Sequence, residues 1–489
     1  MYPKEICVDT ISLSVDDMPS DFLEFAWDNV GNVARLKLMR DMPRTVWLFG
    51  AGASHHYALN AYDVQVPLAN GFFKAFNSLP TSQGFHAHVG PLLNYLHHYR
   101  GIPAAEASEF DENIEEFMTS VESQIMAFKG QGLNGKMNGD DAMRQMALAQ
   151  VYTNMVFLFT NVLNESQNGP VSPVFAYFLK LCTPNDSFVT FNWDTLLDKA
   201  LAATGAWNPV TGYSMKFCGA FDGVWKDRID CSSVTASNWK LLKLHGSTNW
   251  LVPYTTINLQ TLEYASLISE SDKVFLFWQS SLPYDTWSGR WRGGYDFPCY
   301  GYYPPNIPAH YFSPDSLRVQ PEGHVMVSVK YNLFSPFPEP DNEGLPASPL
   351  IITPVKQKRY ELYTTTIENL WQSAESELET TDRIVIVGYS FPATDVRPMS
   401  LLNSVLKKRK GEIEVVIVDP WAKAIVTKLE NELGQNTKSL TPINLPFEEY
   451  VERLWKNKAA ELMKGAVLQS EEVRKWCDRI FMLQKAALH

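Results

Sequence analysis

A glycine-rich turn follows the first strongly apolar run of the sequence, in the stretch VWLFGAGASHH at 46–56. Glycine lets the backbone approach a phosphate group closely, and the N–H groups at the start of a following helix can bind that phosphate. The turn lacks the third glycine of GxGxxG and is not a P-loop, so a strand-to-helix turn without ligand is an equally good interpretation of it alone. The candidate phosphate-binding residues are Gly50, Ala51, Gly52, Ala53 and Ser54.

Two further apolar runs end in side chains that could take part in catalysis. Asn192 and Asp194 follow one run in FNWDTLLD, and His245 follows another in LLKLHGSTNW. An amide and a carboxylate can position a substrate through hydrogen bonds, and a histidine with a pKa of about 6.5 can act as a base at neutral pH. The structural alternatives are a helix cap for the Asn–Asp pair and a non-catalytic role for the histidine.

The last two apolar runs end in loops that could contact a nucleotide. In IVIVGYSFPATD a strand-like segment leads into Gly388 and Ser390, and in VVIVDP it leads into Asp419. A carboxylate at the end of a strand can accept hydrogen bonds from ribose hydroxyls, as in dinucleotide-binding folds. Asp419 is therefore a candidate ribose ligand.

Five short, mainly apolar segments predict the strands that carry these loops. The clearest of them lack alternation, which is typical of central strands in a parallel sheet covered on both faces. Ligands bind at the carboxyl ends of the strands in open α/β sheets, so the five loops are expected to meet at one edge. We therefore predict a doubly wound, Rossmann-like α/β fold. The predicted strands are 45–49, 188–191, 240–244, 384–388 and 414–418.

Two long insertions interrupt the predicted sheet. A helical insertion is expected at about 70–187, because the interval between the first two strands is too long for one crossover. A second insertion, at about 280–354, is rich in proline and aromatic residues. Helical spacing of apolar residues predicts helices at 110–126, 148–163, 421–433, 446–463 and 471–487. The predicted divisions are an N-terminal extension (1–44), one elaborated domain (45–420) and a helical C-terminal segment (421–489).

Composition narrows the class of protein. The chain has 489 residues, of which 45% are hydrophobic and 20% charged, which is typical of a globular protein. The net charge of −12 argues against broad nucleic-acid binding. The six cysteines include no Cys-x-x-Cys pair, so neither a zinc site nor a disulfide scaffold is expected. The start of the sequence has no apolar signal core, and polar residues interrupt the apolar segment 142–164. A soluble, cytoplasmic protein without a membrane span is expected.

Taken together and in order, the motifs GAGAS, FNWD, KLHGS, GYSFPATD and VDP resemble the sirtuin-like (SIR2) domain. More narrowly, the chain resembles the bacterial SIR2-like proteins of anti-phage defence, over residues 45–420. The resemblance implies that a Rossmann-like sheet binds NAD⁺ and that the nicotinamide–ribose bond is cleaved. NAD⁺ would then be the substrate.

Roles for individual residues follow from this resemblance. Asn192 would hold the ribose and the attacking water, and Asp194 would hydrogen-bond the nicotinamide carboxamide. His245 would act as a base or as a partner of a ribose hydroxyl. Residues 50–54 would hold the pyrophosphate, while Gly388 and Ser390 would line the pocket and Asp419 would hold the adenosine ribose.

Departures from the deacylase pattern favour hydrolysis of NAD⁺. Sirtuin deacylases have the motif GAGIS, then a short loop containing IPDFR, and a zinc module with four cysteines. Here the segment after GAGAS is HHYALNAYDVQVPLANGFF, which has no match to IPDFR, and the four-cysteine module is lacking. We expect an NAD⁺ hydrolase that depletes the cofactor in an infected cell, without zinc. Such an activity must be gated, by homo-oligomerisation or by a second defence protein; the resemblance suggests a HerA-type ATPase or a nucleotide-sensing subunit. The alternatives are a non-catalytic nucleotide sensor and an NAD-dependent deacylase or ADP-ribosyltransferase.

Several polar residues near these motifs have no assigned role. His55 and His56 could be a second base, but a structural pair beside the phosphate turn is the favoured interpretation. Glu115 lies on an acidic helix face and could reach the pocket only if the insertion folds over it. Arg290 and Arg292 could contact a partner or cap the site, and solvent exposure is the alternative.

Overall fold

The computed structural model describes most of the predicted domain. The described residues are 43–79, 86–127, 139–217, 219–221, 225–226, 236–253, 255–258, 274–277, 324–327, 347–356, 358, 365–392, 395–410, 413–434 and 440–464. The predicted helix at 471–487, both Arg290 and Arg292, and most of the proline-rich and aromatic insertion lie outside these residues.

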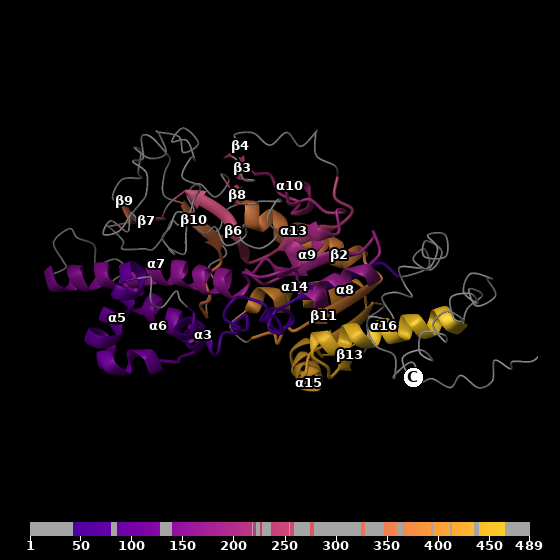
Figure 1. Ribbon diagram of the computed structural model, residues 1–489, viewed down its shortest axis with the longest axis horizontal. Helices are drawn as coiled ribbons and strands as arrows, with labels where there is room; N and C mark the ends of the chain where they lie inside the picture. Colours follow the sequence, from indigo (N-terminus) through magenta and orange to yellow (C-terminus); the bar gives the residue numbers. More distant parts are fainter. Residues whose placement is uncertain are drawn as a thin grey trace, which may run out of the picture.

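A six-stranded parallel sheet forms the centre of the domain, with strand order β13-β12-β11-β1-β2-β5 (Figure 1). Its interior strands are buried along almost their whole length, as the continuous apolar runs predict. The sheet confirms the predicted doubly wound, Rossmann-like fold. Its strands are β1 (Thr45–Phe49), β2 (Ser187–Thr190), β5 (Lys240–Lys243), β11 (Arg383–Val387), β12 (Glu414–Val418) and β13 (Leu440–Ile443).

The sixth strand was not predicted from the sequence. β13 pairs in parallel with β12 at the edge of the sheet, with Val418 opposite Ile443. Its four residues, LTPI, include Pro442, and its two central residues are exposed. Proline is tolerated on an edge strand, but it removes the continuous apolar signal that identified the other five.

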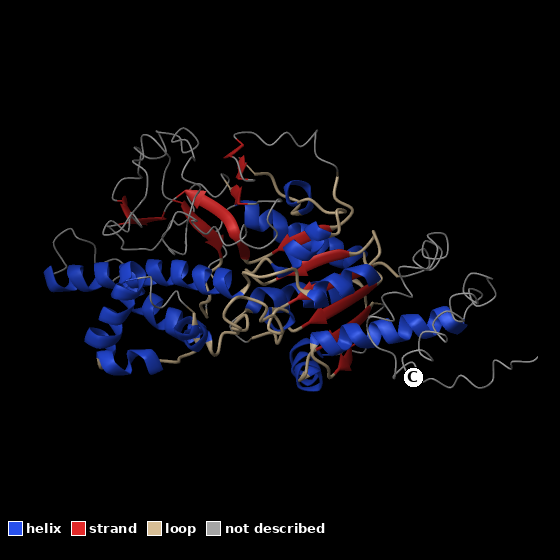
Figure 2. Ribbon diagram, viewed as in Figure 1, coloured by secondary structure: helices blue, strands red, loops and turns tan. Residues whose placement is uncertain are grey.

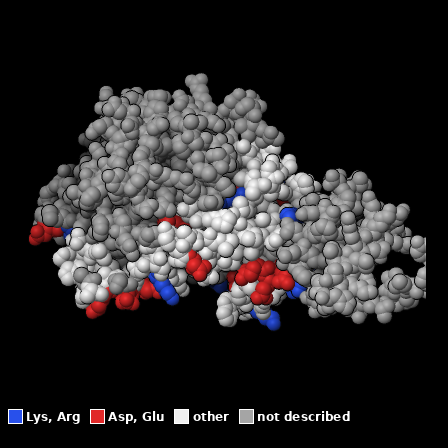
Figure 3. Space-filling model, in the orientation of Figure 1, with Lys and Arg blue, Asp and Glu red and all other residues white. Residues whose placement is uncertain are grey.

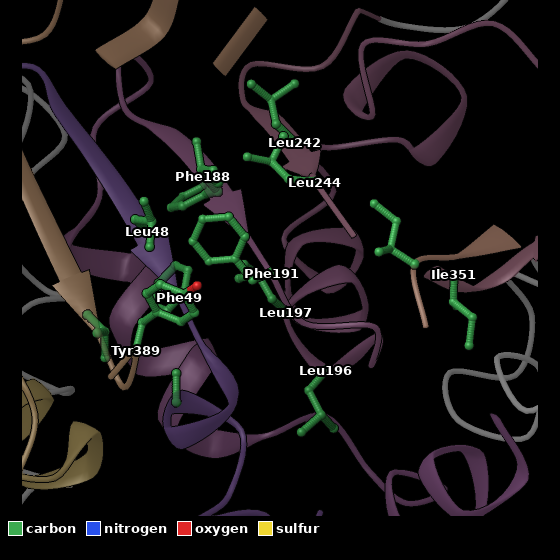
Figure 4. Packing of buried hydrophobic residues seen from close by; sticks show 14 of the residues in the cluster. Leu48, Phe49, Phe188, Phe191, Leu196, Leu197, Leu242, Leu244, Ile351 and Tyr389 are labelled. Atoms are coloured by element: carbon green, nitrogen blue, oxygen red, sulfur yellow. The ribbon is translucent and has the colours of Figure 1, made fainter. Parts of the chain in front are cut away.

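Helices cover both faces of the sheet (Figure 2). Phe178 on α8 packs edge-on against Trp47 of β1, with 4.6 Å between the ring centroids, and Phe447 on α16 packs against Phe49 at 5.7 Å. Figure 4 shows part of the resulting core, where side chains of β1, β2 and β5 lie together. The covering helices are α8 (Pro173–Leu181), α9 (Leu196–Ala203), α13 (Thr365–Thr380), α14 (Val396–Lys408), α15 (Ala422–Leu433) and α16 (Phe447–Lys464).

The segment between β1 and β2 is largely helical, and apart from α8, which packs on the sheet, its helices extend away from the sheet (Figure 1). The expected helix at 110–126 begins later, at Ile114, because Asn113 caps it by accepting hydrogen bonds from the backbone of Glu115 and Glu116. The predicted helix at 148–163 is the interior of α7. The helices are α3 (Phe72–Ser78), α5 (His86–Arg100), η4 (Ala104–Glu109), α6 (Ile114–Met126) and α7 (Gly139–Ser166). Within the described part of the chain, no helix is long and apolar enough to cross a membrane.

A second sheet lies beside the carboxyl edge of the first, and the sequence did not predict it. Its strand order is β10-β6-β8-β3-β4, and a separate pair, β7-β9, accompanies it. β6 starts at Gly246, directly after His245, so the chain passes from one sheet to the other at this histidine. The strands are β3 (Gly219–Phe221), β4 (Trp225–Lys226), β6 (Gly246–Pro253), β7 (Thr255–Asn258), β8 (Phe275–Phe277), β9 (His324–Val327) and β10 (Ala347–Ile351); the short helix α10 (Pro209–Gly212) precedes them.

Candidate functional site

The five polar loops predicted from the sequence lie at one edge of the parallel sheet. All six strands run in the same direction, so residues that follow their carboxyl ends share that edge. His245 follows the terminal strand β5, whereas Asp419 follows β12 on the other side of β1. Four strand spacings separate these two positions, which is about 19 Å at the usual spacing of a sheet. A ligand that contacts both must be long.

The glycine turn after β1 contacts the loop after β11 backbone to backbone. The Gly52 amide donates to the Gly388 carbonyl over 2.9 Å, and the Gly50 amide donates to the Val387 carbonyl over 2.9 Å. A Cβ at Gly388, whose φ is +62°, would lie 2.3 Å from the Ala53 nitrogen. These glycines are therefore required by the contact between the loops, whether or not a ligand is bound.

The turn differs in one respect from the expected phosphate-binding arrangement. It forms a three-residue 3₁₀ helix, Ala51–Ala53, and the next α-helix, α3, begins only at Phe72. The Ala53 and Ser54 amides bond the Gly50 and Ala51 carbonyls within the turn. Within the described residues 43–79, no α-helix begins directly after this turn, and four of its five amides already have partners inside the protein.

Asn192 joins the loop after β2 to the glycine turn. Its Nδ2 donates to the Gly50 carbonyl over 2.9 Å and to the Ser54 hydroxyl over 3.1 Å, and the side chain is buried. Both amide hydrogens are used in these bonds. The Oδ1 atom accepts no hydrogen bond from the described residues, so it is the atom available to a water or a ribose hydroxyl.

Asp194 accepts a hydrogen bond at the start of α9 without occupying its N-cap. Its Oδ1 accepts from the Leu196 amide over 3.1 Å, whereas the N-cap residue is Thr195, whose side chain makes no capping bond. Below it lies a buried ion pair, in which the Lys243 ammonium is 3.1 Å from Asp198 and also donates to the Asp194 carbonyl. Tyr213 donates to the same Asp198 carboxylate. This network fixes the loop that contains Asn192 and Asp194, through the bond from Lys243 to the Asp194 carbonyl.

His245 lies among aromatic rings at the end of β5 and is only 2% exposed. The rings of Phe191, Trp193 and Trp371 have centroids 5.1, 6.0 and 6.3 Å from its own. Burial in these apolar surroundings lowers the pKa of His245 to about 4, against a smaller opposing effect from Asp395. The imidazole is therefore neutral near pH 7, which is the form that can accept a proton.

Two charged residues beside this histidine were not selected from the sequence. Asp395 Oδ2 is 3.5 Å from His245 Nε2, 3.1 Å from Lys358 Nζ and 2.9 Å from the Tyr389 hydroxyl. Asp395 is the last residue of GYSFPATD, so its carboxylate at the end of this motif is the sequence signal that could identify it. No motif in the sequence indicated Lys358.

The far end of the edge carries the predicted ribose-binding carboxylate. Asp419 is half-buried, and its Oδ1 accepts a hydrogen bond of 2.8 Å from the Trp421 amide. Burial raises the pKa of this carboxyl group. Ser390 is exposed at the same edge, beside the buried Tyr389. The expected nucleotide contacts of both residues remain predictions.

His55 and His56 bond to neighbouring segments. His55 Nδ1 lies 2.8 Å from the Val66 carbonyl, and His56 Nε2 lies 3.0 Å from the Ser172 hydroxyl. The His56 ring also packs against Phe175 and Phe447. Burial lowers the pKa of His56. These contacts agree with the structural interpretation of the pair.

Glu115 is connected to the residues around His245 by its contact with Lys358. Its Oε1 is 3.8 Å from Lys358 Nζ, and that ammonium also contacts Asp395, so α6 of the helical insertion reaches the network around His245. Across the described ranges, three or more His, Cys, Asp or Glu side chains nowhere come together in a group that could hold a metal ion.

Solved structures of Sir2 proteins are similar to this chain. A mutant Sir2 homologue bound to ADP-ribose is 12% identical, with a TM-score of 0.34, and the match covers 88% of this chain and 99% of the other. A Sir2 homologue in complex with NAD has the same identity and TM-score, covering 88% and 94%. A structure describing the mechanism and regulation of Sir2 enzymes is 10% identical, with a TM-score of 0.32, covering 91% and 100%. No protein-family model and no curated protein sequence matches this chain.

Proposed function

We propose that this protein is an NAD⁺ hydrolase that cleaves the nicotinamide–ribose bond. The observation that carries the proposal is the placement of Asn192 and the buried His245 at the ends of the adjacent strands β2 and β5, with Asn192 bonded to the glycine turn. The five motifs that resemble the SIR2 domain form the loops at the carboxyl edge of this sheet. The span of about 19 Å from His245 to Asp419 suits an extended dinucleotide.

The proposed reaction consumes water and releases nicotinamide, ADP-ribose and a proton. The bond between the ribose C1′ and the nicotinamide nitrogen breaks, and the electron pair leaves with the neutral nicotinamide. Oδ1 of Asn192 holds the ribose or the attacking water, whose oxygen bonds to C1′. His245 accepts the proton from that water, and the surrounding rings exclude other water.

Nicotinamide release from NAD⁺ by the purified full-length chain tests this proposal, alone and after activation. We expect His245→Ala and Asn192→Ala to lose about 10²–10⁴-fold in rate, the usual effect of losing a positioned catalytic group. His55→Ala is the matched control, because that histidine follows the glycine turn and bonds the Val66 carbonyl. Wild-type rates in both site variants would disprove the assignment. Tight binding of NAD⁺ that stays intact would instead support the nucleotide sensor, and release only with an acyl-lysine peptide would support the deacylase.

The biological role rests on the resemblance alone. In this role the enzyme depletes cellular NAD⁺ during phage infection. It is activated by assembly or by a partner, such as a HerA-type ATPase or a nucleotide-sensing subunit. Figure 3 shows acidic side chains gathered where α15 and α16 lie, and Glu448 and Glu449 are exposed in the first turn of α16. Size-exclusion chromatography with and without the neighbouring operon proteins, read alongside NAD⁺ loss, tests this role. Equal NAD⁺ loss in both samples would contradict gating by those proteins.

A further inference from the structure

A cluster of charged side chains lies next to His245 and has no place in the reaction described above. Asp395 is 2% exposed, and its Oδ2 lies close to three groups: His245 Nε2, Lys358 Nζ and the Tyr389 hydroxyl. A carboxylate this deeply buried is costly unless it has hydrogen-bonding or charged partners. Its position therefore calls for an explanation beyond packing.

The ordinary structural role of such a residue is not the one that Asp395 takes. It occupies the N-cap of α14, where aspartate usually accepts a hydrogen bond from the first turn of the helix. Its side chain makes no such capping bond. Instead the carboxylate contacts the Tyr389 hydroxyl, Lys358 and the histidine.

Lys358 reaches this carboxylate from a segment held along helix α6. The Lys356 amide donates to the Thr119 hydroxyl over 2.8 Å, and the Lys356 ammonium is 3.8 Å from Glu116. One helical turn before Thr119 on α6, the Glu115 carboxylate is 3.8 Å from Lys358 Nζ. The Lys358 side chain is 3% exposed, whereas that of Lys356 is 48% exposed. The ammonium of Lys358 thus lies between two carboxylates, one on α6 and one beside His245.

The geometry points to Asp395 as a positioning residue for His245, and to Lys358, held by α6, as the cation that competes for the same carboxylate. This inference rests on the proposed function, in which His245 accepts a proton from water. The imidazolium that forms would lie 3.5 Å from Asp395, which stabilises it. Lys358 opposes that stabilisation, so the position of α6 relative to the sheet regulates how readily His245 accepts the proton.

The charged groups around His245 act in opposite directions. Asp395 raises the pKa of His245, and Lys358 and, less strongly, Arg397 lower it; burial is the largest effect and also lowers it. Arg397 pairs with Glu368, and its guanidinium lies over the Trp371 ring at 4.4 Å from the centroid. Removing Asp395 and removing Lys358 should therefore shift the titration of His245 in opposite directions. A positioning role predicts in addition that the acid limb of nicotinamide release moves with the titration, whereas a purely structural role predicts that it does not.

Titration of the histidine Cε1–H signals by NMR, in the full-length chain, measures this directly, with His245→Gln to assign the signal. We expect Lys358→Met to raise the midpoint of His245 by about one pH unit or more. Asp395→Asn should lower it, and the double variant should lie between the two. Glu115→Gln should also lower the midpoint. Without the Glu115 carboxylate, the Lys358 ammonium pairs with Asp395 alone of these two acids, which weakens the stabilisation that Asp395 gives the imidazolium. Lys356→Met and Glu116→Gln are the matched controls and should leave it unchanged.

The dependence of nicotinamide release on pH, measured at saturating NAD⁺, provides the second measurement. Its acid limb should move in the same direction as the NMR midpoint in each variant. If Asp395→Asn does not fold, Lys358→Met and Glu115→Gln still give opposite shifts. Equal shifts in the same direction, or none, would overturn the inference. A wild-type chain that releases no nicotinamide would defeat the proposed function instead, while the NMR titration would still decide whether the three charges act on His245.

Discussion

The side-chain amide of Asn192 donates both of its hydrogens to the glycine turn, one to the Gly50 carbonyl at 2.9 Å and one to the Ser54 hydroxyl at 3.1 Å. These two bonds connect the ends of β2 and β1. A residue expected to contact the ligand therefore also fixes the turn that is expected to hold the pyrophosphate. Substitution of Asn192 should affect both binding and the reaction.

Asn192→Asp tests this double role. Replacing both donors by an anion puts negative charge beside the Gly50 carbonyl, so we expect a loss of about 1–3 kcal/mol in the free energy of unfolding. NAD⁺ affinity should fall as well. Urea denaturation and isothermal titration calorimetry measure the two effects. Ser54→Ala removes one acceptor only and should show the smaller loss in each; equal losses would show that the Gly50 bond contributes nothing.

The buried histidine should make stability depend on pH in a defined window. The unfolded chain takes up a proton at His245 below about pH 6.5, whereas the folded chain does so only near pH 4, because burial lowers the pKa. The folded state therefore loses stability as the pH falls from 6.5 to 4, with a slope approaching about 1.4 kcal/mol per pH unit from this group. Denaturation of His245→Gln over the same range should show a shallower slope. Identical slopes would mean that His245 titrates normally.

Gly388→Ala should disturb both loops that meet at the site. Gly388 has φ +62°, and an added Cβ would lie 2.3 Å from the Ala53 nitrogen and 2.6 Å from the Gly52 carbonyl carbon. Gly71→Ala is the matched control, since Gly71 has φ +82° and ψ 7°, in the left-handed region, and nothing within 4 Å of the added atom. Both variants carry the strain of a positive φ, of order 1–2 kcal/mol, and only the first adds a clash. Thermal unfolding should show a larger drop in Tm for Gly388→Ala, and NAD⁺ binding should weaken in that variant alone.

The buried ion pair below Asp194 should contribute strongly to stability. Lys243 and Asp198 are 0% and 1% exposed, so removing the lysine leaves an uncompensated buried charge. We expect Lys243→Met to cost about 3–5 kcal/mol. Lys240→Met, on the same strand, removes an ion pair to Glu377 in which the lysine is 57% exposed, and should cost less than about 1 kcal/mol. Chemical denaturation of both variants gives the comparison, and similar costs would contradict the role of burial.

The sequence was sufficient to predict five of the six strands of the parallel sheet and the loops that follow them at its carboxyl edge. Strands such as 45–49 and 414–418 carry a continuous apolar signal, and the polar residue after each identifies that edge. The second sheet escaped prediction because β3, β4 and β8 have only two or three residues each, and because β6 pairs with strands that lie elsewhere in the sequence. Sequence patterns also do not show long-range contacts, so the approach of Lys358 to Asp395 and the use of the glycine amides within the protein became visible only in the structure.

The backbone contact between Gly52 and Gly388 has a consequence for sequence variation. A side chain at either position would occupy the space of the other loop, although the two lie 336 positions apart in the chain. Neither loop can therefore diversify independently. In homologous sequences, or in a library randomised at both loops, functional variants should keep glycine at the two positions together or replace them in correlated pairs.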